Sequence, residues 1–402
     1  RQEQPEDCVG NLSPQVHSPV LMRVRNGLEL MCSSEPKNGK DYRHIKALIL
    51  QAATLENRTS AESFLKYEKI WDKFGTWRKR LNESQMEAVR MADKQRCTLI
   101  QGPPGTGKTL TISYIISRLV FQMREDREGG LVVVTASANR VCRDQMKGIR
   151  DIDMPTGHNV DCMWYVANGW ADNVDSELKR WTPPEAILSP PAGVRKALGR
   201  GEELKMQDLQ MKKKDGKLSD SERRTYESYY HKAFKQRADA IEVAVATVPQ
   251  AGLKSIEKRR VKAVILDEGE LCTEHMAGIL LGLAPERIII VGDDKQLRCR
   301  QVVTEIAHQG SLFSRIQKSI DSCMLTEHRR SARSALLEVV SKWLYGGRLV
   351  FSEEVTTDRR ASAARAGIWK YNTETYAWHQ VEGVEDKGKS ISSNSWRNLT
   401  EA

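Results

Sequence analysis

The sequence predicts an α/β fold in which helices flank a mainly parallel sheet. A strand-like apolar run at residues 97–100 leads into a glycine-rich loop, and a helix-like run at 110–121 leads out of it. Further apolar runs lack the alternation with polar residues that marks a half-exposed strand, which is typical of parallel strands covered on both faces. These runs are residues 131–135, 243–247, 261–266 and 288–291. Separated as they are by helical segments, they indicate a sheet with helices on both sides.

The loop at residues 102–109 reads GPPGTGKT and matches the pattern G-x-x-x-x-G-K-[ST] at every fixed position. Its glycines allow the backbone to curl so that successive N–H groups face phosphate oxygens, and the following helix adds its positive N-terminal end. Lys108 is expected to bridge the β- and γ-phosphates of ATP, and the Thr109 hydroxyl to ligate Mg²⁺. The predicted nucleotide ligands of the loop are Gly102, Gly105, Thr106, Gly107, Lys108 and Thr109.

Length, charge and cysteine usage narrow the class of protein. The 402 residues are enough for two or three domains with cores of their own. A net charge of +10 favours an anionic partner such as nucleic acid. The eight cysteines form no C-x-x-C pair, which argues against a zinc ribbon and fits a cytoplasmic or nuclear location. No apolar run reaches the roughly 18–20 residues that span a membrane, so no membrane partner is expected.

The chain is predicted to divide into four parts. Residues 1–80 form a helical and irregular N-terminal segment, and residues 81–150 together with 241–345 form the α/β domain. Residues 151–240 are an insertion into that domain, and 346–402 are a linker with the start of a further domain. The predicted elements outside the sheet are an irregular stretch at 1–40, helices at 41–53, 60–74 and 332–344, strands at 368–371 and 378–381, and the start of a helix at 395–402.

The insertion is predicted to hold a short strand at 162–166 and a helical hairpin. Its two helices, 201–214 and 219–239, are separated by the turn signal Asp215-Gly216. An apolar stripe at helical spacing favours a hairpin that packs on itself, and basic residues leave open a protrusion near nucleic acid. The stripe is Tyr226, Tyr229, Tyr230, Ala233 and Phe234, and the basic residues are Lys212, Lys213, Lys214, Arg223 and Arg224.

Two adjacent carboxylates follow the apolar run at 261–266. Asp267 is expected to hold Mg²⁺ through water or beside Thr109, and Glu268 to orient or deprotonate the attacking water. Polar groups also follow the next strands, and ligands of open α/β sheets gather at such strand ends. Gln296 is expected to bond the γ-phosphate, and an arginine of the Arg329-Arg330 pair to offset its charge.

Gln85 lies seventeen residues before the loop, near a helix start that Asn82 or Ser84 can cap. Its side-chain amide offers one donor and one acceptor together, which suits the edge of an adenine base. By itself a glutamine at a helix start is usually a surface residue, and the adenine interpretation of Gln85 gains its weight from the phosphate loop downstream.

Taken together in this order, the motifs resemble those of superfamily-1 helicases, and more narrowly the up-frameshift-type RNA helicase family. The motifs are LNESQMEAV, GPPGTGKT, an Asn at a strand end, DE, GDDKQL and LTEHRR followed by a YGG turn. The resemblance covers about residues 80–350. It implies a RecA-like P-loop NTPase domain with a parallel sheet flanked by helices, which carries a helical-hairpin insertion.

The resemblance also implies roles for single residues. Gln85 would read adenine, Asp267 would serve the metal and Glu268 the water. Gln296 and Arg329 would sense the γ-phosphate. Asn139 and Thr247 fall in segments that touch the nucleic-acid backbone in the family. The implied cofactors are ATP and Mg²⁺, and the implied partners are nucleic acid, with RNA favoured over DNA, and proteins of an RNA-processing or decay complex.

The sequence departs from the family pattern at several motifs. Gly269-Glu270-Leu271 follows the carboxylate pair where a small pair and Gln are usual, and Arg298 stands where a Pro is usual. Ser137-Ala138-Asn139 replaces Pro-Ser-Asn, and Glu327-His328-Arg329 replaces Gln-Tyr-Arg. The chain also ends where a second RecA-like domain is expected to begin. It is therefore expected to bind ATP–Mg²⁺ but not to unwind nucleic acid alone.

Three functional classes fit the phosphate loop. The first is the ATP-hydrolysing core of a nucleic-acid helicase, and the second is a catalytically weakened helicase-like scaffold that binds nucleotide or RNA. The third is an AAA-type ring ATPase, since GPPGTGKT also suits that family. GDDKQL, the Gln85 motif and the insertion at 151–240 favour a helicase over the ring ATPase.

Overall fold

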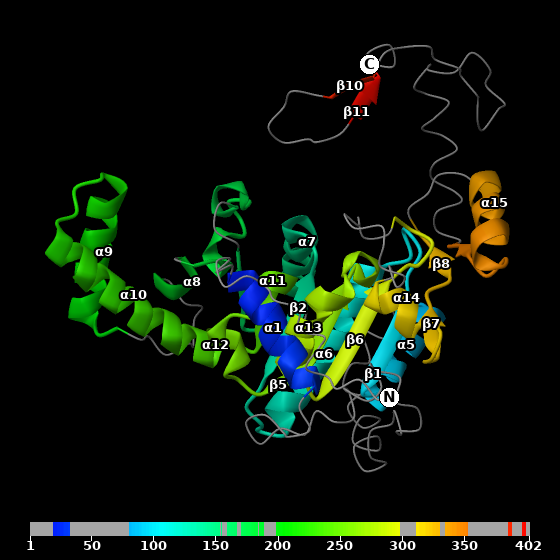
Figure 1. Ribbon diagram of the computed structural model, residues 1–402, viewed down its shortest axis with the longest axis horizontal. Coiled ribbons are helices and arrows are strands. Elements are labelled where there is room, and N and C mark those ends of the chain that lie inside the picture. Colours follow the sequence, from blue (N-terminus) through cyan, green and yellow to red (C-terminus); the bar gives the residue numbers. More distant parts are fainter. Residues whose placement is uncertain are drawn as a thin grey trace, which may run out of the picture.

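A seven-stranded parallel sheet forms the centre of the molecule (Figure 1). The computed structural model describes residues 19–32, 80–152, 154, 159–166, 170–183, 185–188, 198–297, 311–329, 334–352, 385–387 and 396–398. The strands of the sheet are β1 (Cys97–Gln101), β2 (Leu131–Ala136), β3 (Cys162–Tyr165), β4 (Val243–Thr247), β5 (Val261–Asp267), β6 (Arg287–Gly292) and β7 (Ser322–Met324). Their order is β3-β4-β2-β5-β6-β1-β7. The predicted α/β class is thus confirmed, and β6 separates the strand before the phosphate loop from the strand before the carboxylates.

The strand register brings the predicted site segments to one edge of the sheet. Ala136, the last residue of β2, pairs with Thr247 on one side and with Asp267 on the other. Gln101, the last residue of β1, pairs in the same way with Gly292 of β6 and with a residue of β7. All the loops that follow these strands therefore leave the sheet at the same edge.

Alternate residues of each strand face two separate apolar cores, which is why these strands read as unbroken apolar runs. On one face, Ile100 and Val134 pack with helices α5 (Glu83–Lys94), α6 (Lys108–Glu125) and α7 (Asn139–Arg150). On the other face, Leu99 and Val133 pack with α1 (Pro19–Cys32), α11 (Val248–Ala251), α12 (Lys254–Glu257), α13 (Glu274–Gly282) and α14 (Leu312–Ile316). The result is a three-layer arrangement with the sheet in the middle.

The segment between α7 and β4, which was predicted to be an insertion, contains a helical hairpin that projects from the sheet (Figure 1). Its helices are α9 (Arg200–Lys214) and α10 (Asp220–Ala240), and Ser219 and Glu222 form a capping box at the start of α10. The hairpin has a small core of its own that includes Met206 and Tyr226. The same segment also contains β3, α8 (Glu185–Leu188) and two short 3-10 helices, η2 (Ala171–Asn173) and η3 (Lys179–Trp181).

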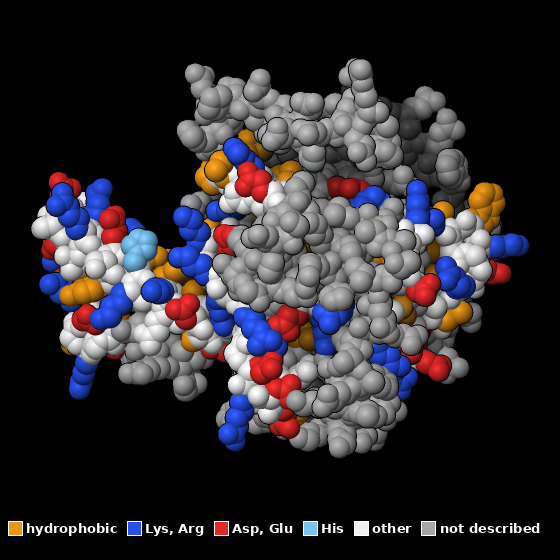
Figure 2. Space-filling view, turned by 60° about the horizontal axis from the view of Figure 1, so that its bottom comes forward, with side chains coloured by type: hydrophobic (Ala, Val, Ile, Leu, Met, Phe, Trp, Pro, Cys, Tyr) orange, Lys and Arg blue, Asp and Glu red, His pale blue; other side chains and the backbone are white. Residues whose placement is uncertain are grey.

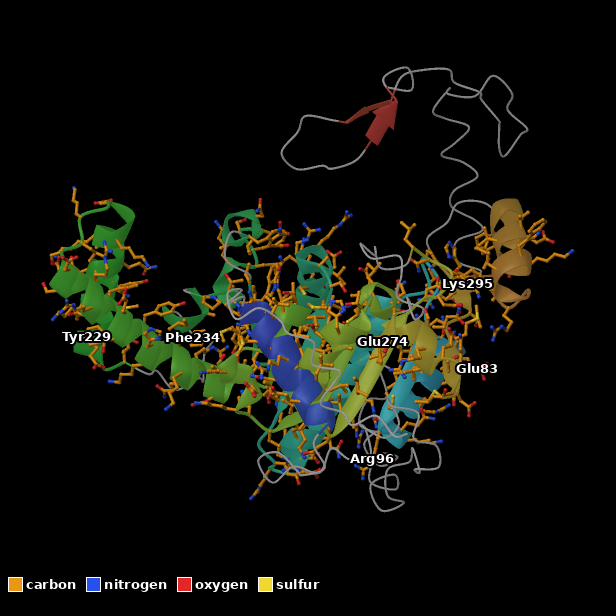
Figure 3. All side chains as sticks on the ribbon, in the orientation of Figure 1. Glu83, Arg96, Tyr229, Phe234, Glu274 and Lys295 are labelled. Carbon is orange, nitrogen blue, oxygen red and sulfur yellow. The ribbon has the colours of Figure 1, made fainter. Side chains whose placement is uncertain are left out.

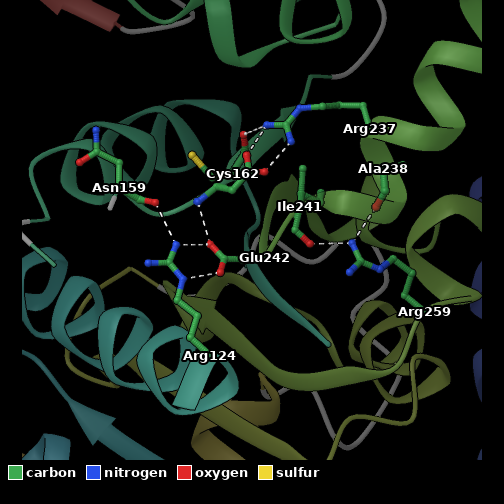
Figure 4. A network of polar contacts seen from close by, with 9 residues as sticks. Arg124, Asn159, Cys162, Arg237, Ala238, Ile241, Glu242 and Arg259 are labelled. Atoms are coloured by element: carbon green, nitrogen blue, oxygen red, sulfur yellow. Dashed lines mark hydrogen bonds and ion pairs between the residues drawn. The ribbon is translucent and has the colours of Figure 1, made fainter. Parts of the chain in front are cut away.

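A network of buried and half-buried ion pairs joins the root of the hairpin to the sheet (Figure 4). Arg237 of α10 makes a two-point ion pair with Asp161, the residue before β3. Glu242, just before β4, accepts from Arg124 of α6 at 2.6 Å and from the backbone N–H of Asp161 at 2.9 Å. Arg259 donates to the carbonyl oxygens at the end of α10. The hairpin therefore leaves the sheet at a fixed angle.

Two sequence predictions outside the sheet were wrong. Residues 1–40 were expected to be irregular, but residues 19–32 form α1, which packs against α13. The approach is so close that a Cβ on Gly27 would lie 2.0 Å from the carbonyl oxygen of Gly278. The chain end was expected to start a helix, but β11 (Trp396–Asn398) pairs antiparallel with β10 (Glu385–Lys387).

The remaining elements are short or lie beside the sheet. They are η4 (Gly269–Leu271), β8 (Glu327–His328), β9 (Val350–Phe351) and α15 (Ser334–Tyr345). The helices predicted at 41–53 and 60–74 and the strands predicted at 368–371 and 378–381 lie outside the described residues. No helix among the described residues combines the length and apolar character needed to cross a membrane.

Candidate nucleotide-binding site

The phosphate-binding loop connects β1 to α6 and is held in shape by its own side chains. Gly105 and Gly107 have φ of 75° and 84°, a left-handed conformation that favours glycine. The Thr106 hydroxyl is fully buried and donates to the carbonyl oxygen of Pro103 at 2.7 Å. Lys108 Nζ donates to the carbonyl oxygen of Gly102 at 2.8 Å, so its charge lies over the loop. The loop and its lysine are therefore set up to receive an anion.

Gln85 lies under the loop and connects it to α5. Its Oε1 accepts from the backbone N–H of Asn82 at 3.1 Å as part of a capping box, and its Nε2 donates to the carbonyl oxygen of Thr106 at 3.0 Å. The side chain is fully buried, and a Cβ on Gly107 would lie 2.4 Å from its Nε2. Gln85 therefore supports the loop directly, and its predicted contact with adenine stays a prediction.

The two carboxylates at the end of β5 differ in exposure. Asp267 is 4% exposed and accepts from the backbone N–H of Glu268 at 2.9 Å. Burial raises the pKa of Asp267 above its ordinary value, while a hydrogen bond from Gln145 and the charge of Lys108 lower it. Glu268 is half-buried with φ of 51°, a conformation that is uncommon for a residue with a side chain. Burial and the neighbouring Asp267 raise the pKa of Glu268, as suits a base.

Gln145 of α7 is part of this site, although no motif predicts a role for it. Its Nε2 donates to Asp267 Oδ2 at 2.6 Å, and the side chain is 1% exposed. A signal was present in the pattern of α7, because Gln145 lies among the apolar residues Cys142, Met146 and Ile149 on the buried face. A polar side chain on the core face of a helix needs a buried partner.

Asp293, two residues before the Lys295 that Figure 3 labels, is the centre of the hydrogen bonds at the end of β6. This fully buried carboxylate accepts from Gln296 Nε2 at 2.9 Å and from the Tyr345 hydroxyl at 2.7 Å. Gln101 at the end of β1 donates to the neighbouring Asp294 at 2.8 Å. The predicted γ-phosphate sensor Gln296 is thus held by a residue that α15 also contacts.

Glu270 is a third carboxylate in the site and was noted in the sequence only as a departure from the family motif. It is 3% exposed, and its Oε2 accepts from the backbone N–H of Asp293 at 3.0 Å. A Cβ on Gly292 would lie 2.4 Å from the same oxygen, so a larger residue there would displace the Glu270 carboxylate. Burial raises the pKa of Glu270 to about 7. The group joins the end of β5 to the end of β6.

The β8 segment lies directly on the phosphate loop. The backbone N–H of Arg329 donates to the carbonyl oxygen of Gly105 at 2.8 Å, and His328 Nδ1 lies 2.6 Å from that of Pro104. The Arg329 side chain, in turn, pairs with Glu327 at 3.1 Å. The structure thus places the predicted arginine beside the loop, with its guanidinium held by an acid of the same segment.

The predicted nucleic-acid residues lie at the same edge of the sheet. Asn139 is the first residue of α7, three residues after β2, and Thr247 is the last residue of β4. Thr247 is 6% exposed and caps α11 without a side-chain hydrogen bond. Register places the end of β2, which leads into Asn139, between Thr247 on one side and Asp267 on the other.

The described residues contain no group of three or more His, Cys, Asp or Glu side chains that could hold a metal ion by itself. Thr109 and Asp267 would therefore hold Mg²⁺ only with phosphate oxygens and water, which is how this ion is commonly bound. Cys97, Cys142 and Cys162 are buried, and burial raises the pKa of each thiol to about 12. These three cysteines pack as core residues and do not supply a thiolate nucleophile.

Comparison with known proteins identifies the family. A family model described as "AAA domain" matches residues 85–300. "Regulator of nonsense transcripts 1" of Dictyostelium discoideum is 30% identical over 332 residues, which is 80% of this chain and 23% of that protein. "ATP-dependent helicase upf1" of Schizosaccharomyces pombe is 26% identical over 80% of this chain and 33% of that protein. The "DNA polymerase alpha-associated DNA helicase A" of the same yeast is 27% identical over 75% of this chain and 44% of that protein.

The chain thus spans less than half the length of each of these three relatives. The solved "PRRSV helicase" matches with a TM-score of 0.31 and 13% identity over 67% of this chain and 37% of that one, so the fold assignment rests on the strand order. Several of the relatives are named as helicases, and another, of Mus musculus, is named "3'-5' exoribonuclease HELZ2". The chain therefore belongs to the AAA domain family, and it is similar in sequence to regulators of nonsense transcripts and to ATP-dependent helicase upf1.

Proposed function

We propose that this chain is the ATP-binding and ATP-hydrolysing core of a nucleic-acid helicase or translocase that acts on RNA. One observation carries the proposal: the loop 102–109, the Asp267–Glu268 pair and the Asn139 and Thr247 segments share one edge of a parallel sheet. A nucleotide and a nucleic-acid strand bound at that edge would be neighbours. The net charge of +10 suits the second of these ligands.

Each side chain has a chemical role in this proposal. Lys108 and the loop N–H groups would bind the β- and γ-phosphates of ATP, while Thr109 and Asp267 would hold Mg²⁺. Bound there, the ion would neutralise charge on the phosphates. Glu268, with its raised pKa, would take a proton from the attacking water. Gln296 and Arg329 would contact the γ-phosphate once their hydrogen bonds, to Asp293 and Glu327 respectively, are broken.

RNA is proposed over DNA because relatives are named as regulators of nonsense transcripts, although another relative is named as a DNA helicase. Backbone contacts of the kind expected at Asn139 and Thr247 read phosphate and sugar and not base sequence. The same proposal includes protein partners in RNA processing or decay and a cytoplasmic or nuclear location.

The test is ATP hydrolysis by this chain with single-stranded RNA, single-stranded DNA or neither. The wild type should turn over ATP faster with RNA. Lys108→Ala should lose nucleotide binding, and Glu268→Gln should bind nucleotide but lose about 10²–10⁴-fold in rate, the usual contribution of a general base. Lys254→Ala, at an exposed position of α12, is the matched control and should behave as the wild type.

Three outcomes change the proposal. Nucleotide binding without turnover in any condition would favour the weakened, helicase-like scaffold. ATP hydrolysis that is stimulated by DNA and not by RNA would mean that DNA is the partner. ATP turnover at the wild-type rate in Glu268→Gln would mean that another residue is the general base.

A further inference from the structure

We propose that helix α7 transmits nucleic-acid binding at Asn139 to the Mg²⁺ ligands, and that Gln145 is the positioning residue that does so. The inference rests on the proposed function and adds a physical connection between its two ligands. It follows from where α7 begins and from what its buried face contacts.

The first contact of α7 is with the metal-binding carboxylate. Gln145 lies six residues after Asn139, between one and two helical turns along α7. Its Nε2 donates to Asp267 Oδ2 at 2.6 Å, and neither side chain is more than 4% exposed. Because Asp267 also accepts from the backbone at Oδ1, the two bonds fix the orientation of its carboxylate.

The second contact of α7 is with the metal-binding threonine. A Cβ built on Gly148 would lie 2.7 Å from Ser113 Oγ and 3.2 Å from Thr109 Cγ2. Ser113 in turn donates to the carbonyl oxygen of Thr109 at 2.9 Å. One face of α7 thus bonds one predicted Mg²⁺ ligand, Asp267, through Gln145, and at Gly148 approaches the other, Thr109. A shift of the helix would move both.

Two acceptors on α7 lack hydrogen-bond partners although they are buried. They are Asn139 Oδ1 at the start of the helix and Gln145 Oε1 beside Asp267. Buried polar atoms are nearly always paired, and those that are not mark sites of strain or of a missing ligand. A second position of α7, adopted when nucleic acid binds at Asn139, could satisfy these acceptors. The bond to Asp267 would carry that shift to the metal site.

The experiment measures how strongly RNA and nucleotide affect each other's binding to the full chain. A fluorescent, non-hydrolysable ATP analogue is titrated with Mg²⁺ in the presence and absence of a single-stranded RNA oligomer. In the wild type, RNA should change the dissociation constant by about fivefold or more, within the usual range of allosteric coupling. Gln145→Leu should reduce the change below about twofold, while RNA affinity without nucleotide stays the same. Gln122→Leu, a half-buried glutamine on α6, is the control and should keep the wild-type coupling.

The remaining outcomes separate this inference from the proposed function. Wild-type coupling in Gln145→Leu would overturn the inference, and so would a joint loss of RNA and nucleotide binding, which would indicate a role in folding alone. A wild type that binds both ligands without coupling would overturn this inference and leave the proposed function intact. A wild type that binds no nucleotide would overturn both.

Discussion

The nucleotide-binding site and the α9–α10 hairpin differ in how far apart in the sequence their hydrogen-bonded residues lie. At the site, hydrogen bonds join residues distant in sequence, such as Gln145 and Asp267, which are 122 positions apart. Within the hairpin, Lys212 bonds Glu222 ten positions away and Lys232 bonds a residue thirty positions away. The site depends on the whole sheet, whereas the hairpin is specified largely by its own sequence and joined to the sheet at its root.

The same difference is visible in two glutamates. Burial at the site raises the pKa of Glu270 to about 7. On the hairpin surface, hydrogen bonds from Lys212 and Ser219 lower the pKa of Glu222 to about 2. Figure 2 shows this surface as the lobe on the left, where basic and acidic side chains alternate. Burial thus sets the pKa of the glutamate in the site, whereas hydrogen bonds set that of the glutamate on the hairpin, whose face in Figure 2 carries mixed charge.

The largest expected decrease in the free energy of unfolding is for a substitution at the root of the hairpin, where α10 meets the sheet. Arg237→Ala leaves Asp161 without its two-point partner in a largely buried setting. Removing one member of a buried ion pair costs about 3–5 kcal/mol, because the other charge stays desolvated. Urea unfolding should show this decrease in the free energy of unfolding. Arg224→Ala, an exposed position on the same helix, should show no comparable change. Equal stabilities of the two variants would mean that the root network does not anchor the hairpin.

The sheet and the hairpin could be predicted from the sequence because their signals are local. The predicted strand at Val243–Thr247 has the same first and last residues as β4, because an apolar run and its flanking residues are enough to locate a buried strand. The hairpin helices followed from their turn and aromatic stripe, and in Figure 3 Phe234 lies nearer the sheet than Tyr229. There Phe234 meets Tyr165 of β3, with ring centroids 6.1 Å apart, a contact that no local pattern encodes. The division of the chain into domains stays a prediction.

The next effect is smaller and depends on pH. Glu270 has a pKa of about 7 in the fold against an ordinary value of 4.5, so the folded state holds its proton more tightly than the unfolded state. The stability that this proton gives is fully present below pH 4.5 and is lost as the pH rises to about 7. Glu270→Gln keeps an acceptor for the Asp293 N–H and does not titrate.

Thermal or urea unfolding of Glu270→Gln should therefore match the wild type near pH 4.5. At pH 8 the variant should be more stable by about 3–3.5 kcal/mol, because the pKa of Glu270 rises from 4.5 to about 7 and each pKa unit corresponds to about 1.4 kcal/mol. Glu257→Gln on α12, a half-buried glutamate away from the site, is the control. A stability difference that is the same at both pH values would show that Glu270 does not titrate in this range.

The site was only partly predictable because motif spacing identifies residues but not their partners. The sequence located Lys108, Asp267 and Gln296 at strand ends, and the structure brings those strand ends to one edge. It could not show that Gln296 bonds a buried aspartate, or that Gln145 reaches Asp267 from another helix. Such contacts depend on the packing of helices on the sheet, which periodicity alone does not determine. The chemical roles of these residues stay predictions until the variants are measured.

The smallest effect is expected at the hairpin surface. Lys212 lies between Asp208 and Glu222 at 3.1 and 2.9 Å, but exposed ion pairs add little to stability because water screens them and ordering their side chains costs entropy. Lys212→Ala should thus leave the urea unfolding midpoint unchanged within error, beside the marked loss in Arg237→Ala. The pKa of Glu222, followed by NMR, should rise only part of the way to its ordinary value, because the Ser219 hydroxyl still donates to it at 2.7 Å. A midpoint lowered as far as in Arg237→Ala would show that the hairpin depends on its surface pairs as much as on its root.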